Sequence, residues 1–282
     1  MRAPVDTIAA PLFPRHLPWV NVRAPQAPIQ RGRPMLVEFW DFCRPNSLRT
    51  LPYVKAWHER YGVPAGQPGA TEGGELRVIG VHSPGFAPAR DEQAVRDAVR
   101  RLGISYPVLI DGELELWREY ENAGWPARYL FDGRARLHHY HYGEGAYGET
   151  ELAIQELLGV SRELLRPLRP EDADGTRLRA QTADQPGPYS GPYEAGGVWA
   201  VLEGRGRVRV AVTHRPLRAP DEREDSRAPA SGDRRTIERE LHVEHPGAYP
   251  LIEHTRHTAG VLRLEIGAGV TCHATCFSPG IP

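Results

Sequence analysis

A lone cysteine stands where an apolar run gives way to a helical pattern, a position suited to thiol chemistry. The stretch VEFWDFCRPNSLRTLPY, residues 37–53, contains Cys43, and Pro45 is a favoured first residue of a helix. Unpaired amide groups and the positive end of a helix dipole favour a thiolate there, and Arg44 adds a full charge. Cys43 is therefore a candidate nucleophile; the alternative is that it only fills space.

The number of cysteines limits this chemistry. Dithiol exchange needs a second thiol to attack the mixed disulfide, and the other two cysteines, Cys272 and Cys276, lie far along the chain. They fall in one predicted strand, where four residues at about 3.3 Å each keep them too far apart to bond to each other. A bridge from Cys43 to one of them is a further, weaker hypothesis. The motif itself therefore allows only a reaction that uses a single thiol.

Histidines offer a second kind of candidate. His82 ends the apolar run LRVIGVH, at a strand end where loops often carry function. In HHYHYGEGAY, His139 and His141 share one face of a predicted strand. Two histidines can ligate zinc, but the pattern supplies no third ligand at useful spacing, so structural histidines and no metal site are expected. No nucleotide-binding loop or Ser-His-Asp pattern stands out, and no cofactor is predicted.

The bulk composition is that of an ordinary globular protein long enough for two domains. The 282 residues are 40% hydrophobic and 25% charged, with a formal net charge of −1. This balance gives no global attraction to nucleic acid or to an anionic membrane surface. The chain has no apolar run near the ~20 residues that span a bilayer and no signal-peptide pattern at its start. We therefore expect a cytoplasmic protein.

The elements that would position Cys43 follow an α/β pattern. Predicted strands are 35–40, 76–82, 127–132 and 135–143, predicted helices are 46–62, 91–103 and 148–159, and residues 106–111 and 112–121 add a short extended piece and a helical piece. The order strand, helix, strand, helix, strand, strand, helix, with an extra helical turn before Pro126, predicts a mixed sheet covered by helices. This domain, with its N-terminal extension, is assigned to residues 1–160.

The second half has a different pattern. Residues 161–195 are polar and rich in Pro, Gly and Arg, which predicts a linker packed over the surface. Residues 196–282 contain short alternating runs separated by Gly turns, which predicts an antiparallel β-sandwich domain. Within it, residues 215–235 form a polar loop that we expect to be mobile.

Several stretches in order resemble the thioredoxin superfamily, especially the thioredoxin-like domain of DipZ-type thiol–disulfide carriers and redoxins. The resemblance covers nearly all of residues 35–160 and is carried by LVEFW, LRTLPYVKAWHERYG, VIGVHSP, AVRRLGISYPVLID, WPARYLFD and HYGEGAYGETE. It implies a thioredoxin-like fold. The second half weakly resembles the jelly-roll, carbohydrate-binding-like sandwich that can follow such a domain in these relatives.

The same resemblance implies that the dithiol motif is degenerate. In the family, three residues separate the strand from the first cysteine of Cys-x-x-Cys, which places Arg44 and Ser47 at the two cysteine positions. Pro52 matches the helix-kink proline five residues after the second position and gives the same alignment. A one-residue deletion would instead align CRPN with Cys-x-Pro-Cys, with Cys43 as nucleophile and Asn46 as its partner.

Further site residues come from the resemblance alone. Glu38 matches the buried acid that helps move protons for the resolving cysteine; the alternative is a leftover carboxylate paired with a polar group. Trp125-Pro126 matches the cis-proline beside the motif, where an extended peptide docks by β-augmentation. Trp40, Trp125 and Pro126 are therefore the predicted substrate-binding residues.

Two functions follow, and the question of catalysis stays open between them. The favoured hypothesis is a non-catalytic binding protein that holds an extended peptide, a protein thiol or a small ligand near Cys43, Ser47 and Pro126. The alternative is an atypical monothiol redox enzyme that acts through Cys43 on a peroxide or mixed disulfides. The β-sandwich is expected to hold a glycan or a protein, with Trp199 and the tyrosines of PYSGPY as stacking candidates and burial in the core as their alternative.

Overall fold

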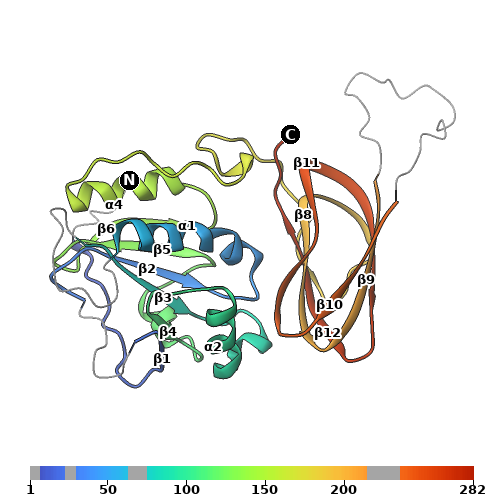
Figure 1. Ribbon diagram of the computed structural model, residues 1–282, viewed down its shortest axis with the longest axis horizontal. Coiled ribbons are helices and arrows are strands. Elements are labelled where there is room, and N and C mark those ends of the chain that lie inside the picture. The colour runs from blue at the N-terminus through green and yellow to red at the C-terminus, as the bar shows by residue number, and fades with distance from the viewer. Residues whose placement is uncertain (1–6, 23–29, 63–74, 215–235) are drawn as a thin grey trace. The chain divides into compact units, whose positions relative to one another are not determined.

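The chain folds as two compact units. The structure, a computed structural model, describes residues 7–22, 30–62, 75–214 and 236–282. The units are Met1–Asp174 and Gly175–Pro282, so they divide within the predicted linker (Figure 1). The polar loop predicted at 215–235 lies outside the described residues.

The first unit is built on a mixed six-stranded sheet with the order β1-β4-β3-β2-β5-β6. The strands are β1 (Trp19–Val20), β2 (Met35–Trp40), β3 (Arg77–His82), β4 (Val108–Ile110), β5 (Ala127–Phe131) and β6 (Leu137–Tyr142). β2, β3 and β4 run parallel, and β1, β5 and β6 join antiparallel. The predicted mixed sheet is confirmed.

Helices cover this sheet because both faces of its central strand are apolar. The helices are α1 (Pro45–Tyr61), α2 (Glu92–Arg101), α3 (Glu115–Glu119) and α4 (Tyr147–Leu158), with short 3₁₀ turns at η3 (Ala87–Arg90) and η4 (Pro170–Asp172). All six residues of β2 are buried. Val37 and Phe39 join a core with Leu116 of α3. The opposite face of the sheet lies under α1 and α4 (Figure 1). Strand alternation places Glu38 and Trp40 on that face.

Residues 161–174 belong to the first unit. The Leu165 amide donates to Glu151 of α4, and the Leu168 amide donates to the Tyr53 hydroxyl of α1. Arg169 forms an ion pair with the buried Asp172 at 3.0 Å. The early part of the predicted linker is therefore fixed to the surface of the helices.

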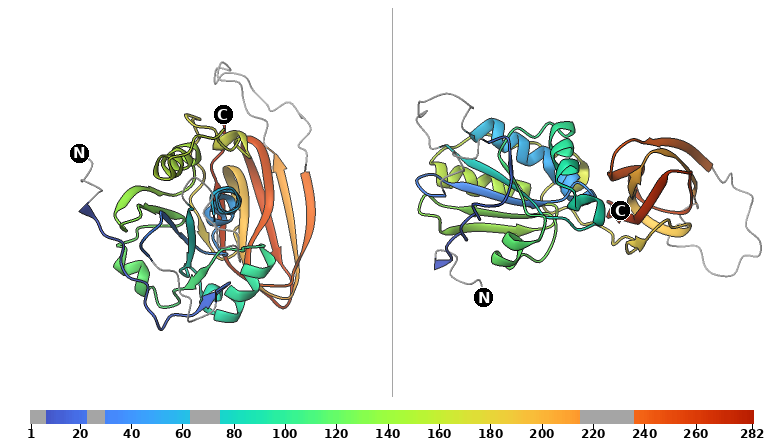
Figure 2. Two further views of the ribbon diagram at one scale, coloured as in Figure 1. Left: turned by 60° about the vertical axis from the view of Figure 1, so that its left-hand side comes forward. Right: turned by 90° about the horizontal axis from the view of Figure 1, so that it is seen from below.

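The second unit is all β and entirely antiparallel, as predicted. Its strands are β7 (Gln185–Pro186), β8 (Gly191–Gly204), β9 (Gly206–His214), β10 (Thr236–Val243), β11 (Gly247–Ile266) and β12 (Val270–Ser278). They form one six-stranded sheet in the order β10-β9-β11-β8-β12-β7. β11 changes register against β8 between Glu253 and Thr258, and the sheet curls around its own core (Figure 2). The two layers of the predicted sandwich therefore belong to one bent sheet.

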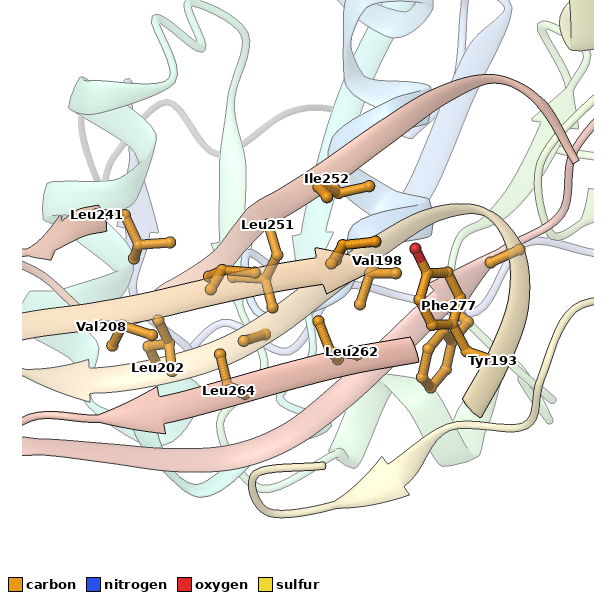
Figure 3. Close-up of a cluster of buried hydrophobic side chains, with 14 of the residues drawn as sticks. Tyr193, Val198, Leu202, Val208, Leu241, Leu251, Ile252, Leu262, Leu264 and Phe277 are labelled. Carbon is orange, nitrogen blue, oxygen red and sulfur yellow. The ribbon is translucent and has the colours of Figure 1, made fainter. Parts of the chain in front are cut away.

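That core follows the alternation of the sequence. Val208, Val210 and Val212 of β9 are buried, whereas Arg207 and Arg209, which alternate with them, are exposed. They meet apolar residues of the other long strands, among them Val198, Leu251, Leu262 and Phe277 (Figure 3).

Three aromatic residues singled out as candidates for sugar stacking lie in this unit. Tyr193 is 3% exposed within the core cluster, Tyr189 is partly buried against that cluster, and Trp199 is 7% exposed. Burial in the core accounts for the Tyr193 side chain. A glycan or protein partner for the second unit stays a prediction.

Candidate functional site

Cys43 lies in the loop between β2 and α1 and is held there by its backbone. Its amide donates to Asp41 Oδ1 at 2.7 Å, and the other Asp41 oxygen accepts from the Gly85 amide at 2.8 Å. The cysteine forms no disulfide among the described residues, and its exposed fraction is 0%. The predicted place at a helix start is therefore found, whereas the exposure that a monothiol reaction requires is not.

Asp41 organises the loop, although the sequence analysis did not single it out. Its carboxylate is fully buried and joins the loops after β2 and β3 through the two bonds described above. His82 Nε2 lies 3.7 Å from Asp41 Oδ1, and the His82 ring stacks on Phe42 with centroids 5.2 Å apart. His82, a remote candidate, is thus a fully buried part of this loop support. The acid directly after a strand is the signal that would have indicated Asp41.

Arg44 is the N-cap residue of α1, and its carbonyl accepts the first helical bond, from the Leu48 amide. The central guanidinium carbon lies 4.6 Å from the ring centroid of Phe86 and also 4.6 Å from that of Trp125. Both contacts are within cation–π range. The Arg44 Nε is buried and has no hydrogen-bond partner among the described residues. A guanidinium therefore occupies the start of the helix, between two aromatic rings.

Trp125 extends this arrangement into an aromatic surface. Its indole donates to the Ser83 carbonyl at 2.8 Å, and its ring lies 4.2 Å from that of Trp117. The Trp125–Pro126 peptide bond is cis, and Pro126 itself is buried. We call the half-buried side chains of Arg44, Phe86, Trp117 and Trp125 the Arg44 shelf.

Two other predicted site residues lie beneath the surface. The Ser47 side chain is 1% exposed, and its hydroxyl accepts from the Asp41 amide at 3.2 Å, so it supports the loop. Trp40, a predicted substrate-binding residue, is 1% exposed and packs edge-on against His82 at 5.1 Å. Its ring faces the core rather than a ligand.

Glu38 is buried opposite a cation. Its register partner on β5 is Arg128, and both side chains are almost completely buried. Burial raises the pKa of Glu38 to about 8, against the opposing effect of the Arg128 charge. Burial also lowers the pKa of Arg128 to about 10, and the nearby Tyr147 opposes this shift. The Arg128 guanidinium lies 5.0 Å from the centroid of the Tyr147 ring. Neither carboxylate oxygen of Glu38 has a hydrogen-bond partner among the described residues, so the polar partner expected in the alternative is not found.

Comparisons with known proteins match about half of the chain. It is 32% identical over 161 residues to Protein DipZ of Mycobacterium tuberculosis, which covers 57% of this chain and 22% of that protein. It is 33% identical over 121 residues to Protein SUPPRESSOR OF QUENCHING 1, chloroplastic, of Arabidopsis thaliana, covering 41% of this chain and 10% of that protein. The chain thus spans less than a quarter of the length of either relative.

A shorter relative matches along most of its own length. The chain is 22% identical over 140 residues to the thiol-disulfide oxidoreductase YkuV of Bacillus subtilis, covering 50% of this chain and 87% of that protein. The solved structure of a thioredoxin-like protein in the oxidized form aligns with a TM-score of 0.45 at 22% identity, over 54% of this chain and 95% of that chain. No family model matches the chain.

None of the helices in the described ranges is long and apolar enough to cross a membrane. The first unit has a thioredoxin-like fold. The chain is similar in sequence to DipZ and to a thiol-disulfide oxidoreductase.

Proposed function

We propose that the first unit is a non-catalytic binding protein on an oxidoreductase scaffold whose dithiol motif is lost. In this reading Arg44 and Ser47 occupy the two cysteine positions. The ligand is an extended peptide or a small molecule that presents a carboxylate to the Arg44 shelf. The observation that carries the proposal is the Arg44 guanidinium, held between Phe86 and Trp125 at the N-cap of α1.

Burial of the thiol supports binding over exchange. Thiol–disulfide exchange requires the thiolate to reach a disulfide sulfur, and Cys43 has an exposed fraction of 0%. Two hydrogen bonds from loop amides to Asp41 hold the surrounding backbone closed. This loop would have to open before the Cys43 thiol could react.

The chemistry of the shelf favours an anion joined to an apolar group. A guanidinium binds carboxylates through charge-assisted hydrogen bonds, and a helix N-terminus adds a favourable dipole. Trp117 and Trp125 lie with ring centroids 4.2 Å apart and offer apolar surface beside that charge. An extended peptide with an aromatic residue next to a carboxylate satisfies both features.

A matched pair of small probes tests the proposal. We expect N-acetyl-phenylalanine to bind more tightly than its amide, measured by ligand-observed NMR, because only the first carries a carboxylate. Arg44→Gln should weaken binding of the acid by about tenfold, which corresponds to the loss of about 1.4 kcal/mol. Arg166→Gln is the control, since its side chain is 90% exposed and lies in the 161–174 segment. Equal binding of acid and amide, or no effect of Arg44→Gln, would refute a carboxylate site.

One observation favours the alternative of a monothiol redox enzyme. Cys43 directly precedes the N-cap of α1 and the guanidinium of Arg44, surroundings that stabilise a thiolate once the loop opens. Rapid consumption of hydrogen peroxide by the native protein, abolished in Cys43→Ser, would support this alternative over binding.

A further inference from the structure

A cavity of ≈ 1060 Å³ lies in the first unit and shares no lining residue with the Arg44 shelf. Its walls come from the chain segments 9–22 and 30–31, from α2 and from the turn between β5 and β6. These parts are distant in sequence, so the cavity is a product of the fold rather than of one loop.

Hydrogen bonds hold the segment in place over the sheet. The Ala10 amide donates to the Ala135 carbonyl at 2.9 Å. On the other side, the Gln30 side chain accepts from the Phe13 amide at 3.1 Å and donates to the Pro11 carbonyl at 2.6 Å. These bonds hold residues 10–13 from two sides, so this part of the cavity wall is formed without a ligand.

The cavity is strongly positive, although the whole chain is nearly neutral. The described residues that line it include a histidine and five arginines but no aspartate or glutamate, the arginines being Arg15, Arg31, Arg96, Arg134 and Arg136. The formal charge of the whole chain is −1, so this excess is local.

Among the described residues, one of the five arginines has an acidic partner and three have no side-chain partner at all. Arg96 forms an ion pair with Glu92, and Arg136 donates to the Thr7 carbonyl. The side chains of Arg15, Arg31 and Arg134 have no hydrogen-bond or ion-pair partner in the described parts of the chain. Like charges around one cavity repel, and an anion placed among them would relieve that repulsion.

An apolar wall lies beside these charges. Phe13 and Trp19 are half-buried and meet edge to face, with ring centroids 5.6 Å apart. Leu12 lines the same cavity with 81% of its surface exposed. Cavities that combine apolar walls with a few convergent polar groups are typical of small-molecule sites.

We propose that this cavity binds a small organic polyanion, with two or more phosphate or carboxylate groups and a flat or apolar part. Guanidinium groups pair with both kinds of oxygen in bidentate geometry, so the anionic groups would lie among Arg15, Arg31 and Arg134. The apolar part packs against Phe13 and Trp19. This site is independent of the function proposed for the Arg44 shelf.

Calorimetric titration of the full chain tests the site with two probes that separate the sources of negative charge. ADP supplies phosphates and benzene-1,3,5-tricarboxylate supplies carboxylates, each with a flat ring. We expect one-site binding of at least one probe. Arg15→Gln and Arg134→Gln should each weaken it about tenfold, equivalent to 1.4 kcal/mol. Arg166→Gln, outside the cavity, should bind as the wild type does.

Two further titrations separate the contribution of charge to the affinity from that of the apolar contact. If ADP is the probe that binds, pyrophosphate and adenosine should each bind more weakly than ADP. The proposal is overturned if neither probe binds, or if both arginine variants bind as tightly as the Arg166→Gln control. Equal affinities for pyrophosphate and ADP would overturn the apolar contact.

Discussion

Restoring two thiols at the first turn of α1 should restore exchange chemistry if Arg44 and Ser47 occupy the two cysteine positions. The test variant is Arg44→Cys/Ser47→Cys in a background where Cys43, Cys272 and Cys276 are serine. Position 44 is the N-cap of α1 and position 47 lies three residues on, in its first turn. One helical turn brings such residues within the Cα separation of about 4.4–6.8 Å that a disulfide spans.

The two new cysteines should cost less stability than a folded domain typically has. Arg44→Cys removes two cation–π contacts, worth about 0.5–1 kcal/mol each at a partly exposed site. Ser47→Cys weakens one hydrogen bond from the Asp41 amide, worth about 0.5–1.5 kcal/mol. The total of about 1.5–3.5 kcal/mol is less than the 5–15 kcal/mol typical of folded domains. The helix N-terminus would favour a thiolate at position 44 by about 0.3–1 kcal/mol.

Reduction of insulin disulfides by dithiothreitol is the assay. We expect the Arg44→Cys/Ser47→Cys variant to accelerate it and the wild type not to. The matched comparison is Asn46→Cys with Cys43 retained, which builds the pair that the one-residue deletion would predict. Activity in the Asn46→Cys variant alone would refute our alignment. Inactivity of both variants, with native circular dichroism, would refute the claim that the scaffold lacks only its thiols.

Three further predictions concern the supports of the site and the second core. The pKa of Glu38 is raised to about 8, so the folded state keeps a proton that the unfolded state releases near pH 4.5. This residue should therefore lower the free energy of unfolding as the pH rises from about 4.5 to 8. In urea unfolding, Glu38→Gln should remove this loss, at most about 1.4 kcal/mol per pH unit; an unchanged slope would contradict the raised pKa. Asp41→Ala leaves two loop amides without acceptors and should speed the labelling of Cys43 by a thiol reagent more than tenfold. Asp41→Asn keeps an acceptor and should change the labelling rate less. Equal labelling rates in the two variants would refute the role of Asp41 in holding the loop. Phe277→Ala should destabilise the second unit by about 3–5 kcal/mol in thermal unfolding, and a loss below 1 kcal/mol would contradict its place in the core.

Local pattern was sufficient to predict the main strands and helices of the first unit and the alternating strands of the second, but not the short strands β1 and β7. The apolar run MLVEFW became the buried strand β2, and Pro45 began α1 as its position suggested. In the second unit, the alternation of Val208, Val210 and Val212 identified the inward face of β9. Each of these features depends on neighbours a few residues away, which a sequence displays directly.

Contacts between distant segments could not be predicted in this way. Asp41 accepts from Gly85, 44 residues later, and this bond helps to bury Cys43. Phe86 gives no sign in the sequence that it would cover Arg44. The 161–174 segment has a linker composition, yet the Leu168 amide bonds to Tyr53, 115 positions away. The direction of a side chain at a loop depends on such partners, so motif position alone did not reveal that Cys43 points inward.

The rate at which a thiol reagent labels Cys43 in the native protein tests the central claim most directly. In a Cys272→Ser/Cys276→Ser background, a buried Cys43 should react only as fast as the loop or the domain opens, so the rate should rise steeply when urea is added. The account predicts slow labelling that accelerates with denaturant. Immediate stoichiometric labelling without denaturant would show an accessible thiol and would contradict the proposal that the protein binds its ligand without thiol chemistry.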